Sequence, residues 1–191
     1  MTRMPKINLV LLASWSRTRD SEMVTYRNSS RFCIRDIGFY NQLPVLTKSI
    51  GESYPGHFRW LSNVFLGGSC NGNRGYSFAI DNNKFTDVSY GRMVQIYKLA
   101  GCALLKNTDE EKKICCLFVD PEYRHQGIAS RLIENSFEML GTNKPLMTVA
   151  ENNLSQLQKL VNRYGFELTS VRDSVYRRGI KEYYYNEGLA K

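Results

Sequence analysis

The sequence predicts a mixed α/β domain with a central, mostly antiparallel sheet and flanking helices. Three observations predict this fold class. Residues 76–119 are dominated by β-type runs, a strand, helix, strand, helix order follows Asp120, and two further strand-like runs close the chain. A helix stands between the run that ends at Val119 and the run that begins at Leu146, so we expect these two strands to be joined by a crossover and to lie parallel.

The first thirty residues are predicted to be an N-terminal extension, and residues 31–191 a single domain. A chain of 191 residues is long enough to bury a core without a metal or disulfide staple. The apolar run Ile7–Ala13 is too short to span a bilayer and has no small-x-small cleavage site, so we interpret it as a strand or docking segment. The polar Arg27–Ser30 is typical of a connector.

In the next part of the chain, short apolar runs are separated by glycines. Phe32–Arg35 is predicted to be a short strand, and residues 43–50 have helical spacing. Apolar residues at 58, 61, 64 and 65 predict a second amphipathic helix that ends at Gly67-Gly68. The glycine-rich stretch that begins there is predicted to be a loop, and no G-K-S/T follows that would make it a phosphate motif.

Four β-type runs then build the sheet. Two of them, Tyr76–Ile80 and Met93–Tyr97, are expected to be separated by the polar stretch 81–91. Leu99–Leu105 and Ile114–Val119 are expected to meet through a hairpin, because turn-forming residues lie between them.

The C-terminal third alternates helices with strands. Apolar positions from Ile128 to Leu140 mark one helical face, and Gly141 follows as a stop signal. After the predicted strand 146–149, Asn153 and Gln156 stand in capping-box relation before a helix that ends at Gly165. Residues 166–171 and 180–185 are predicted to be the closing strands.

Charge and cysteine usage limit the classes of partner. The formal charge of +8 favours an anionic partner, but Lys and Arg are scattered and form no basic arm that would follow a nucleic-acid backbone. The five cysteines are an odd number without C-x-x-C spacing, so we expect neither a disulfide framework nor a metal site. A reduced, cytoplasmic setting without membrane insertion is therefore expected.

The junction after Val119 has the chemistry of an anion site. A strand runs through Asp120-Pro121-Glu122-Tyr123 into a loop, and Gly127 opens an amphipathic helix. The first turn of a helix presents N–H groups without intrahelical partners, and its dipole adds positive charge, so a diphosphate can be held by backbone alone. Small residues at Gly127 and Ala129 allow close approach, and Arg124 supplies charge at the rim.

The segment I-C-C-L-F-V-D-P-E-Y-R-H-Q-G-I-A-S-R-L-I resembles motif A of the GNAT superfamily of N-acetyltransferases, whose signature is R/Q-x-x-G-x-G/A after a strand. The later N-N-L-S-Q-L-Q-K-L-V-N-R-Y-G-F-E-L is similar to the second cofactor segment of that family. The resemblance covers the chain from Phe32 in outline and is strong over residues 112–186. The tail is similar to an uncharacterised bacterial branch of the superfamily.

The resemblance implies a parallel strand pair splayed into an open V by a bulge, with acetyl-CoA bound in the opening as the acetyl donor. The pantetheine arm would pair with the backbone of two strand residues, and a backbone N–H near Val119 would stabilise the oxyanion. The implied cofactor-binding residues are Leu117, Phe118, Val119, Arg124, His125, Gln126, Gly127, Ile128, Ala129, Ser130 and Asn153.

The resemblance leaves the general acid open. The family often places a Tyr four positions before the Gly of the Gly-Phe pair, and this sequence has Val161 there. The nearest substitute is Tyr164, whose ring could equally pack beneath the sheet. Tyr176 and Tyr185 on the closing strands are the competing candidates.

Candidates for the base and for the acceptor pocket come from the same region. Glu151 at the end of its strand and Glu122 could act as the base. The alternative for each is an ordinary carboxylate exposed to solvent. His125 is expected to contribute its backbone to the phosphate loop. His57, beside Trp60, could line an acceptor pocket or lie on the surface.

The acceptor is left open as a small-molecule amine, a protein amino group or an aminoacyl-tRNA. The last of these would make the chain a toxin-like acetyltransferase, an alternative that the basic charge supports. The missing Tyr at position 161 supports another alternative, an acetyl-CoA-binding module with weak catalysis. A homodimer paired through the closing strands at Tyr183–Tyr185 is a further prediction left open.

Overall fold

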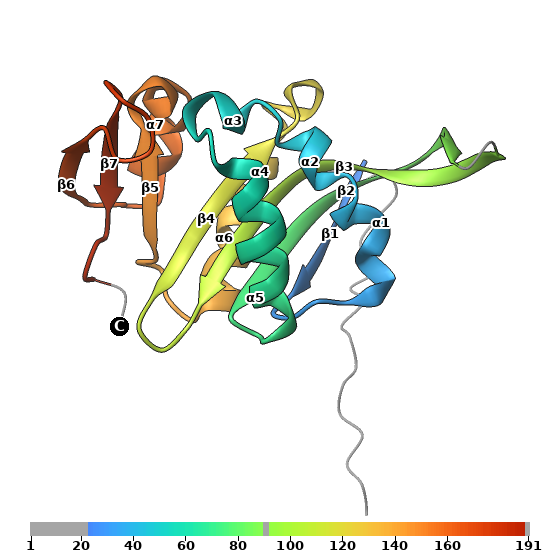
Figure 1. Cartoon of the computed structure of the whole chain (residues 1–191), viewed down its shortest axis with the longest axis horizontal. Helices are drawn as coiled ribbons and strands as arrows, with labels where there is room; N and C mark the ends of the chain where they lie inside the picture. Colours follow the sequence, from blue (N-terminus) through green and yellow to red (C-terminus); the bar gives the residue numbers. More distant parts are fainter. Residues whose placement is uncertain (1–22, 90–91, 190–191) are drawn as a thin grey trace, which may run out of the picture.

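The computed structural model describes residues 23–89 and 92–189, without the side chains of 84–95. Within them the chain forms one mixed sheet in the order β1-β2-β3-β4-β5-β7-β6 (Figure 1), which confirms the predicted fold class. Every neighbouring pair is antiparallel except β4 and β5. The strands are β1 (Val24–Ser29), β2 (Arg74–Ser89), β3 (Arg92–Asn107), β4 (Lys112–Val119), β5 (Leu146–Ala150), β6 (Leu168–Asp173) and β7 (Lys181–Tyr185).

The parallel pair is joined only at its beginning. Lys113 pairs with Leu146 and Ile114 with Met147, and beyond these positions β4 and β5 separate. The register between β3 and β4 shifts at the same place, because Leu104 faces Cys116 whereas Leu105 faces Ile114. Cys115 is thus an extra residue on β4, a bulge that bends the strand. The splayed V implied by the resemblance is present.

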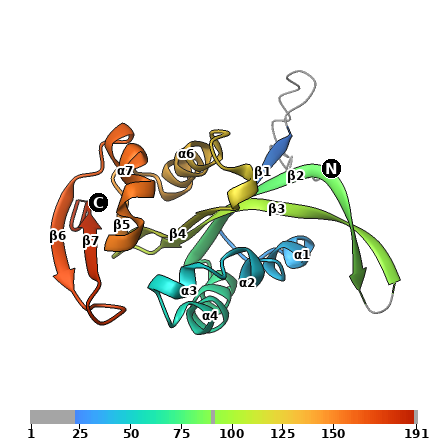
Figure 2. The ribbon, with the colours of Figure 1, turned by 90° about the horizontal axis from the view of Figure 1, so that it is seen from above.

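Helices cover the two faces of the sheet, with α6 and α7 on one side and α1 to α4 on the other (Figure 2). Each face has its own apolar core, one beneath α6 and α7 and one beneath the N-terminal helices. No helix in the described ranges is long and apolar enough to cross a membrane. The helical elements are η1 (Ile34–Asp36), α1 (Ile37–Tyr40), α2 (Leu43–Leu46), α3 (Ile50–Ser53), α4 (His57–Trp60), η2 (Leu61–Leu66), α5 (Gly67–Cys70), η3 (Pro121–Tyr123), α6 (Ile128–Leu140), η4 (Glu151–Asn153) and α7 (Leu154–Arg163).

Two predicted boundaries in the N-terminal half are wrong. The segment 32–35 is not a strand, since its last two residues, Ile34 and Arg35, belong to the short helix η1. The glycine pair 67–68 does not end the preceding helix, which continues through the π-helical η2 into α5. A Cβ atom on Gly68 would lie 2.6 Å from Cγ of Arg74, so this glycine serves close packing against β2 rather than helix termination.

The polar stretch after residue 80 does not break the sheet. β2 and β3 continue as one long antiparallel hairpin whose far end extends beyond the neighbouring strands (Figure 1). The polar residues can stay in this hairpin because each strand supplies the hydrogen-bond partners of the other strand's backbone. The edge strand β1 lies within the predicted N-terminal extension and pairs with β2. The run Ile7–Ala13 lies outside the described residues.

Candidate functional site

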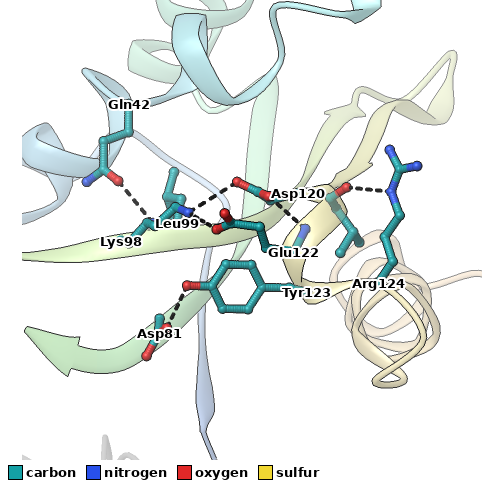
Figure 3. Close-up of polar contacts among 9 residues, drawn as sticks. Gln42, Asp81, Lys98, Leu99, Asp120, Glu122, Tyr123 and Arg124 are labelled. Carbon is teal, nitrogen blue, oxygen red and sulfur yellow. Dashed lines mark hydrogen bonds and ion pairs between the residues drawn. The ribbon is translucent and has the colours of Figure 1, made fainter. Parts of the chain in front are cut away.

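The loop between β4 and α6 is anchored to the sheet by polar contacts (Figure 3). Asp120 caps η3 by accepting a hydrogen bond from the Glu122 N–H (3.0 Å), and Lys98 on β3 pairs with both carboxylates, at 2.7 Å from Glu122 and 3.5 Å from Asp120. The buried Tyr123 donates its hydroxyl to Asp81 on β2 (2.6 Å). The start of the phosphate loop is therefore held by two strands that lie outside the motif.

The Tyr123–Asp81 contact shifts the pKa values of both groups. Burial alone would raise the pKa of the Asp81 carboxyl, but hydrogen bonds from Tyr123 and Asn83 outweigh it and lower that pKa. Burial, followed by the bond to the Asp81 carboxylate, raises the pKa of Tyr123, which therefore remains a donor. The contact is a neutral phenol bonded to a charged carboxylate, the stronger class of hydrogen bond.

The loop itself has the backbone geometry of an anion site. His125 and Gly127 both have positive φ angles, 64° and 81°, and α6 begins directly after Gly127. The N–H groups of Ile128, Ala129 and Ser130 have no intrahelical acceptor because they lie in the first turn. Positive φ is strained for most residues, so Gly127 suits this position whereas His125 bears the strain.

The edge of β4 that faces the V offers backbone groups to a ligand. The Asp120 N–H bonds to the Ala100 carbonyl of β3 (2.9 Å), and backbone groups in an antiparallel ladder alternate in direction. Leu117 and Val119 therefore direct their N–H and C=O groups away from β3, toward the opening. The Val119 carbonyl accepts a hydrogen bond from Nε of Arg124 (3.2 Å; Figure 3), which ties the loop to this edge.

A pocket of about 530 Å³ lies between the arms of the V on the face covered by α3 and α4. This size is ordinary for a ligand site. It brings together predicted site residues from three separate segments, Leu117 on β4, Asn153 before α7 and Tyr176 between β6 and β7. A second hollow, of about 910 Å³, lies over α1, α2 and β3 and has no lining residue from β5.

Tyr54, which lines the pocket, bonds to a buried carboxylate, and this pair was not predicted from the sequence. Tyr54 donates to Oε1 of Glu182 (2.9 Å) and accepts from the Ala150 N–H (3.0 Å). Glu182 is 3% exposed, and burial raises the pKa of its carboxyl. Burial also raises the pKa of Tyr54. The feature of the sequence that could have revealed this pair is the charged Glu182 at an inward position of the closing strand, opposite Ala150.

The predicted catalytic residues are divided between this pocket and other places. The Tyr176 ring packs edge to face on Tyr54, with centroids 5.2 Å apart, and burial raises the Tyr176 pKa. The Tyr164 hydroxyl donates to Glu134 (2.9 Å) and to the Ser130 carbonyl (3.2 Å), between α6 and α7, which supports the packing alternative. Glu151 is exposed at the start of η4 and does not line the pocket.

Two further expected residues have structural contacts. Asn153 precedes α7 but makes no side-chain cap, and its amide instead donates to Ser53 (3.3 Å), so the predicted capping box is not formed. His57 lines the pocket, as one alternative predicted, although its ring is buried and its Nε2 lies 2.7 Å from the Thr47 hydroxyl. Burial lowers the His57 pKa, so the ring is neutral at physiological pH.

Comparison with family models gives a match over part of the chain. Residues 88–168 match a family model described as an acetyltransferase (GNAT) domain. The match spans the loop at Gly127 and confirms the resemblance predicted from that motif. None of the curated proteins matches the chain.

Solved structures share the fold at low sequence identity. One is NAA60 of Arabidopsis thaliana in complex with acetyl-CoA, with 16% identity over 85% of this chain and 96% of that chain and a TM-score of 0.59. An aminoglycoside 6′-N-acetyltransferase complexed with coenzyme A has 12% identity over 83% and 94%, with a TM-score of 0.58. The NatC complex bound to Gag peptide and CoA has 15% identity over 85% and 96%, with a TM-score of 0.53. At these identities the likeness shows the fold alone.

Proposed function

We propose that this protein, whose residues 88–168 match the GNAT acetyltransferase model, transfers the acetyl group of acetyl-CoA to a primary amine. The observation that carries the proposal is the geometry of β4 and β5. The strands part after Ile114 and Met147, a loop leads from β4 into the first turn of α6, and a pocket lies between the arms. Structures of the same fold contain acetyl-CoA or CoA, which supports the same donor here.

The cofactor would lie along the open edge of β4. The first turn of α6 would bind the diphosphate through its free N–H groups, with Arg124 beside it. The pantetheine amides would pair with Leu117 and Val119, whose backbone groups face the opening. The Val119 carbonyl already accepts a hydrogen bond from the Arg124 side chain. An N–H of the pantetheine would therefore either share this carbonyl with Arg124 or displace the Arg124 side chain from it.

The chemistry is nucleophilic acyl transfer. The neutral amine attacks the thioester carbon, the carbonyl oxygen becomes an oxyanion, and the C–S bond then breaks to release the CoA thiolate. A backbone N–H at the open edge near Val119 would stabilise the oxyanion. The amine loses one proton and the thiolate gains one, so the site needs a proton acceptor and a proton donor.

The tyrosines of the pocket wall are the proposed proton carriers. The Tyr54 oxygen would accept the amine proton while its own proton passes to Glu182, because the two groups already share a hydrogen bond of 2.9 Å. A carboxyl with a raised pKa is a better base than an ordinary one. Tyr176, which also lines the pocket, would protonate the thiolate.

The proposal is tested by binding and turnover measured together. Calorimetry should show acetyl-CoA binding, and a thiol-release assay over a panel of amines and peptides should show turnover, with mass spectrometry of acetylated products in a cell lysate to identify the acceptor. Binding with turnover on some acceptor supports the enzyme. Binding without any turnover would instead support the acetyl-CoA-binding module, and absence of binding would exclude both.

The toxin-like alternative rests on the positive charge of the chain and stays a prediction. Acetylation of aminoacyl-tRNA in the same product analysis would support it, together with growth arrest on expression that Gly127→Glu abolishes. A cytoplasmic setting and a homodimer likewise remain predictions from the sequence.

A further inference from the structure

A row of three cations crosses the sheet where β4 and β5 are joined. Arg74 on β2 is the direct partner of Lys106 on β3, and Lys106 is the direct partner of Lys113 on β4. Directly opposite residues of an antiparallel pair project from the same face. All three line the pocket, and Lys113 stands where β4 meets β5.

The row is only partly neutralised by the protein. Glu111 pairs with Lys106 (2.8 Å), whereas Arg74 and Lys113 form no salt bridge with any residue that the structure describes. Arg74 donates to the Cys115 sulfur (3.3 Å), and burial raises the pKa of that thiol to about 11, so it stays neutral. Like charges directly opposite one another destabilise a sheet, so the placement of three cations in one row has a cost for the fold.

The other end of the pocket is the proposed amine end. Tyr54 there accepts from the N–H of Ala150, four residues beyond Leu146, the partner of Lys113. At about 3.3 Å per residue, the two ends lie about 13 Å apart along β5. The pocket thus has the hydroxyl groups of Tyr54 and Tyr176 at one end and cations without a salt-bridge partner, Arg74 and Lys113, at the other.

We propose that Arg74 and Lys113 form an anion subsite, and that the acceptor is an elongated amine with a carboxylate or phosphate at its far end. The assignment of an acceptor rests on the proposed acetyltransferase function, whereas the anion subsite can be measured without turnover. Arg74 suits this role because its guanidinium can bind either anion through two parallel hydrogen bonds, and Lys113 adds a point charge beside it.

The test is thermal unfolding in three salts of equal ionic strength: chloride, acetate and inorganic phosphate. Saturating CoA is present to fill the diphosphate loop. Arg74→Gln and Lys113→Gln are compared with wild type and with Arg59→Gln and Lys159→Gln, which change exposed residues outside the pocket. Calorimetry of CoA with each variant checks separately that the cofactor site is intact.

We expect phosphate, acetate or both to raise the melting temperature of the wild type by about 2–4 °C over chloride in a saturable way. Both pocket variants should lose at least half of this gain and both controls should keep it. The acetate and phosphate arms distinguish a carboxylate from a phosphate.

Equal melting temperatures in all three salts, or a gain that both pocket variants retain in full, would overturn the subsite. Failure of the wild type to bind CoA would instead overturn the proposed function. The two failures are therefore distinguishable, because the salt response does not depend on acetyl transfer.

Discussion

Gly127 is the residue on which the proposed cofactor binding most directly depends. Its φ of 81° places the chain in the left-handed region just before α6, and no atom lies within 4 Å of where a Cβ would be. Gly127→Glu would strain the backbone and place a carboxylate at the anion site. We expect acetyl-CoA affinity, measured by calorimetry, to fall by at least about 100-fold.

The matched control is Gly141→Ala at the other end of the same helix. Gly141 also has a positive φ, 67°, and open space around its Cβ position. The substitution should cost about 1–2 kcal/mol of unfolding free energy, as backbone strain does, and leave acetyl-CoA binding unchanged. If both variants lost affinity equally, the anion-site interpretation of Gly127 would be wrong.

Glu182 tests the proposed proton route. Glu182→Gln should lower kcat by about 100-fold, within the usual contribution of a general base, with acetyl-CoA affinity unchanged. The control is Glu151→Gln, since Glu151 is exposed and outside the pocket, and its activity should match the wild type. If Glu151→Gln lost activity and Glu182→Gln kept it, the base would be Glu151, the candidate from the sequence.

The pH profile gives a second measurement for Glu182. A base acts only when ionised, so kcat/KM of the wild type should rise with pH through the carboxyl pKa, which burial places above its ordinary value of 4.5. That limb should be absent in Glu182→Gln. A raised pKa also means that the folding stability from the protonated carboxyl is present below pH 4.5 and is lost as pH rises through the folded-state pKa.

Individual residues were the hardest part of the site to predict. The candidate phosphate loop could be proposed because consecutive residues form it, from Arg124 to Ser130. Tyr54 and Glu182 meet only after a helix and the last strand fold together across 128 positions of sequence. Tyr164 shows the converse, since its position beside Gly165 suggested chemistry whereas its hydroxyl bonds to Ser130 and Glu134.

Among the elements, η3 is held by the bond between Tyr123 and Asp81 (Figure 3). Asp81→Asn should weaken it and lower the unfolding free energy at pH 7 by about 1–3 kcal/mol, the usual cost for a hydrogen bond to a charged group. Because the Asp81 pKa is lowered in the folded state, its contribution is present above the unfolded value of 3.8 and is lost as pH falls through the folded value.

Denaturant titrations at several pH values check this prediction. The stability difference between wild type and Asp81→Asn should be constant from pH 5 to 7 and shrink below about pH 4. Asn83→Ala gives a comparison, since Asn83 also bonds to Asp81 but does not contact η3. A difference that persists unchanged to pH 2 would contradict the role of the ionised carboxylate.

The approach of β3 to β4 depends on Gly101. A Cβ there would lie 2.8 Å from the Phe118 carbonyl and 3.4 Å from the Val119 Cα. Gly101→Ala should therefore push β4 outward, destabilise the fold by about 1–3 kcal/mol and weaken acetyl-CoA binding. In the control Gly75→Ala, the Cβ would meet the Ser29 carbonyl at 3.0 Å, away from the V. It should lower stability without changing affinity.

Most elements could be predicted because local periodicity and local stop signals agree. The helix from Ile128 to Gly141 is an example, with an apolar face and a left-handed glycine at its end. The exceptions arise where tertiary contacts outweigh local signals. Gly68 lies within a helix because Arg74 packs against it, and the polar residues after Ile80 remain in a strand because β3 pairs with them.

At the scale of the molecule, the sheet separates two cores and the V connects the two faces. The core beneath α6 and α7 supports β4 and the loop before α6, whereas the core beneath the N-terminal helices supports the wall of the pocket. The sequence pointed to the first through one continuous motif. It could not reveal the pocket, because the pocket is lined by residues of α3, β2, β4, β5 and the turn after β6, which are far apart in the sequence.

Acetyl-CoA binding should stabilise the whole molecule, because the cofactor would join β4, α6 and β5 in the folded state only. At a concentration 100 times its Kd, it should add about 2.7 kcal/mol to the unfolding free energy. Amide hydrogen exchange should slow in the first turn of α6 and at the open edge of β4, for example at the N–H groups of Ile128 and Val119, because the bound cofactor would accept hydrogen bonds there.

Gly127→Glu is the control for this measurement, since it should show neither the added stability nor the slower exchange. The β1 edge offers an internal reference, because β1 pairs with β2 on the far side of the sheet and should gain only the global part of the protection. Stabilisation without local protection at α6 would place the ligand elsewhere on a chain whose net charge of +8 attracts anions in general.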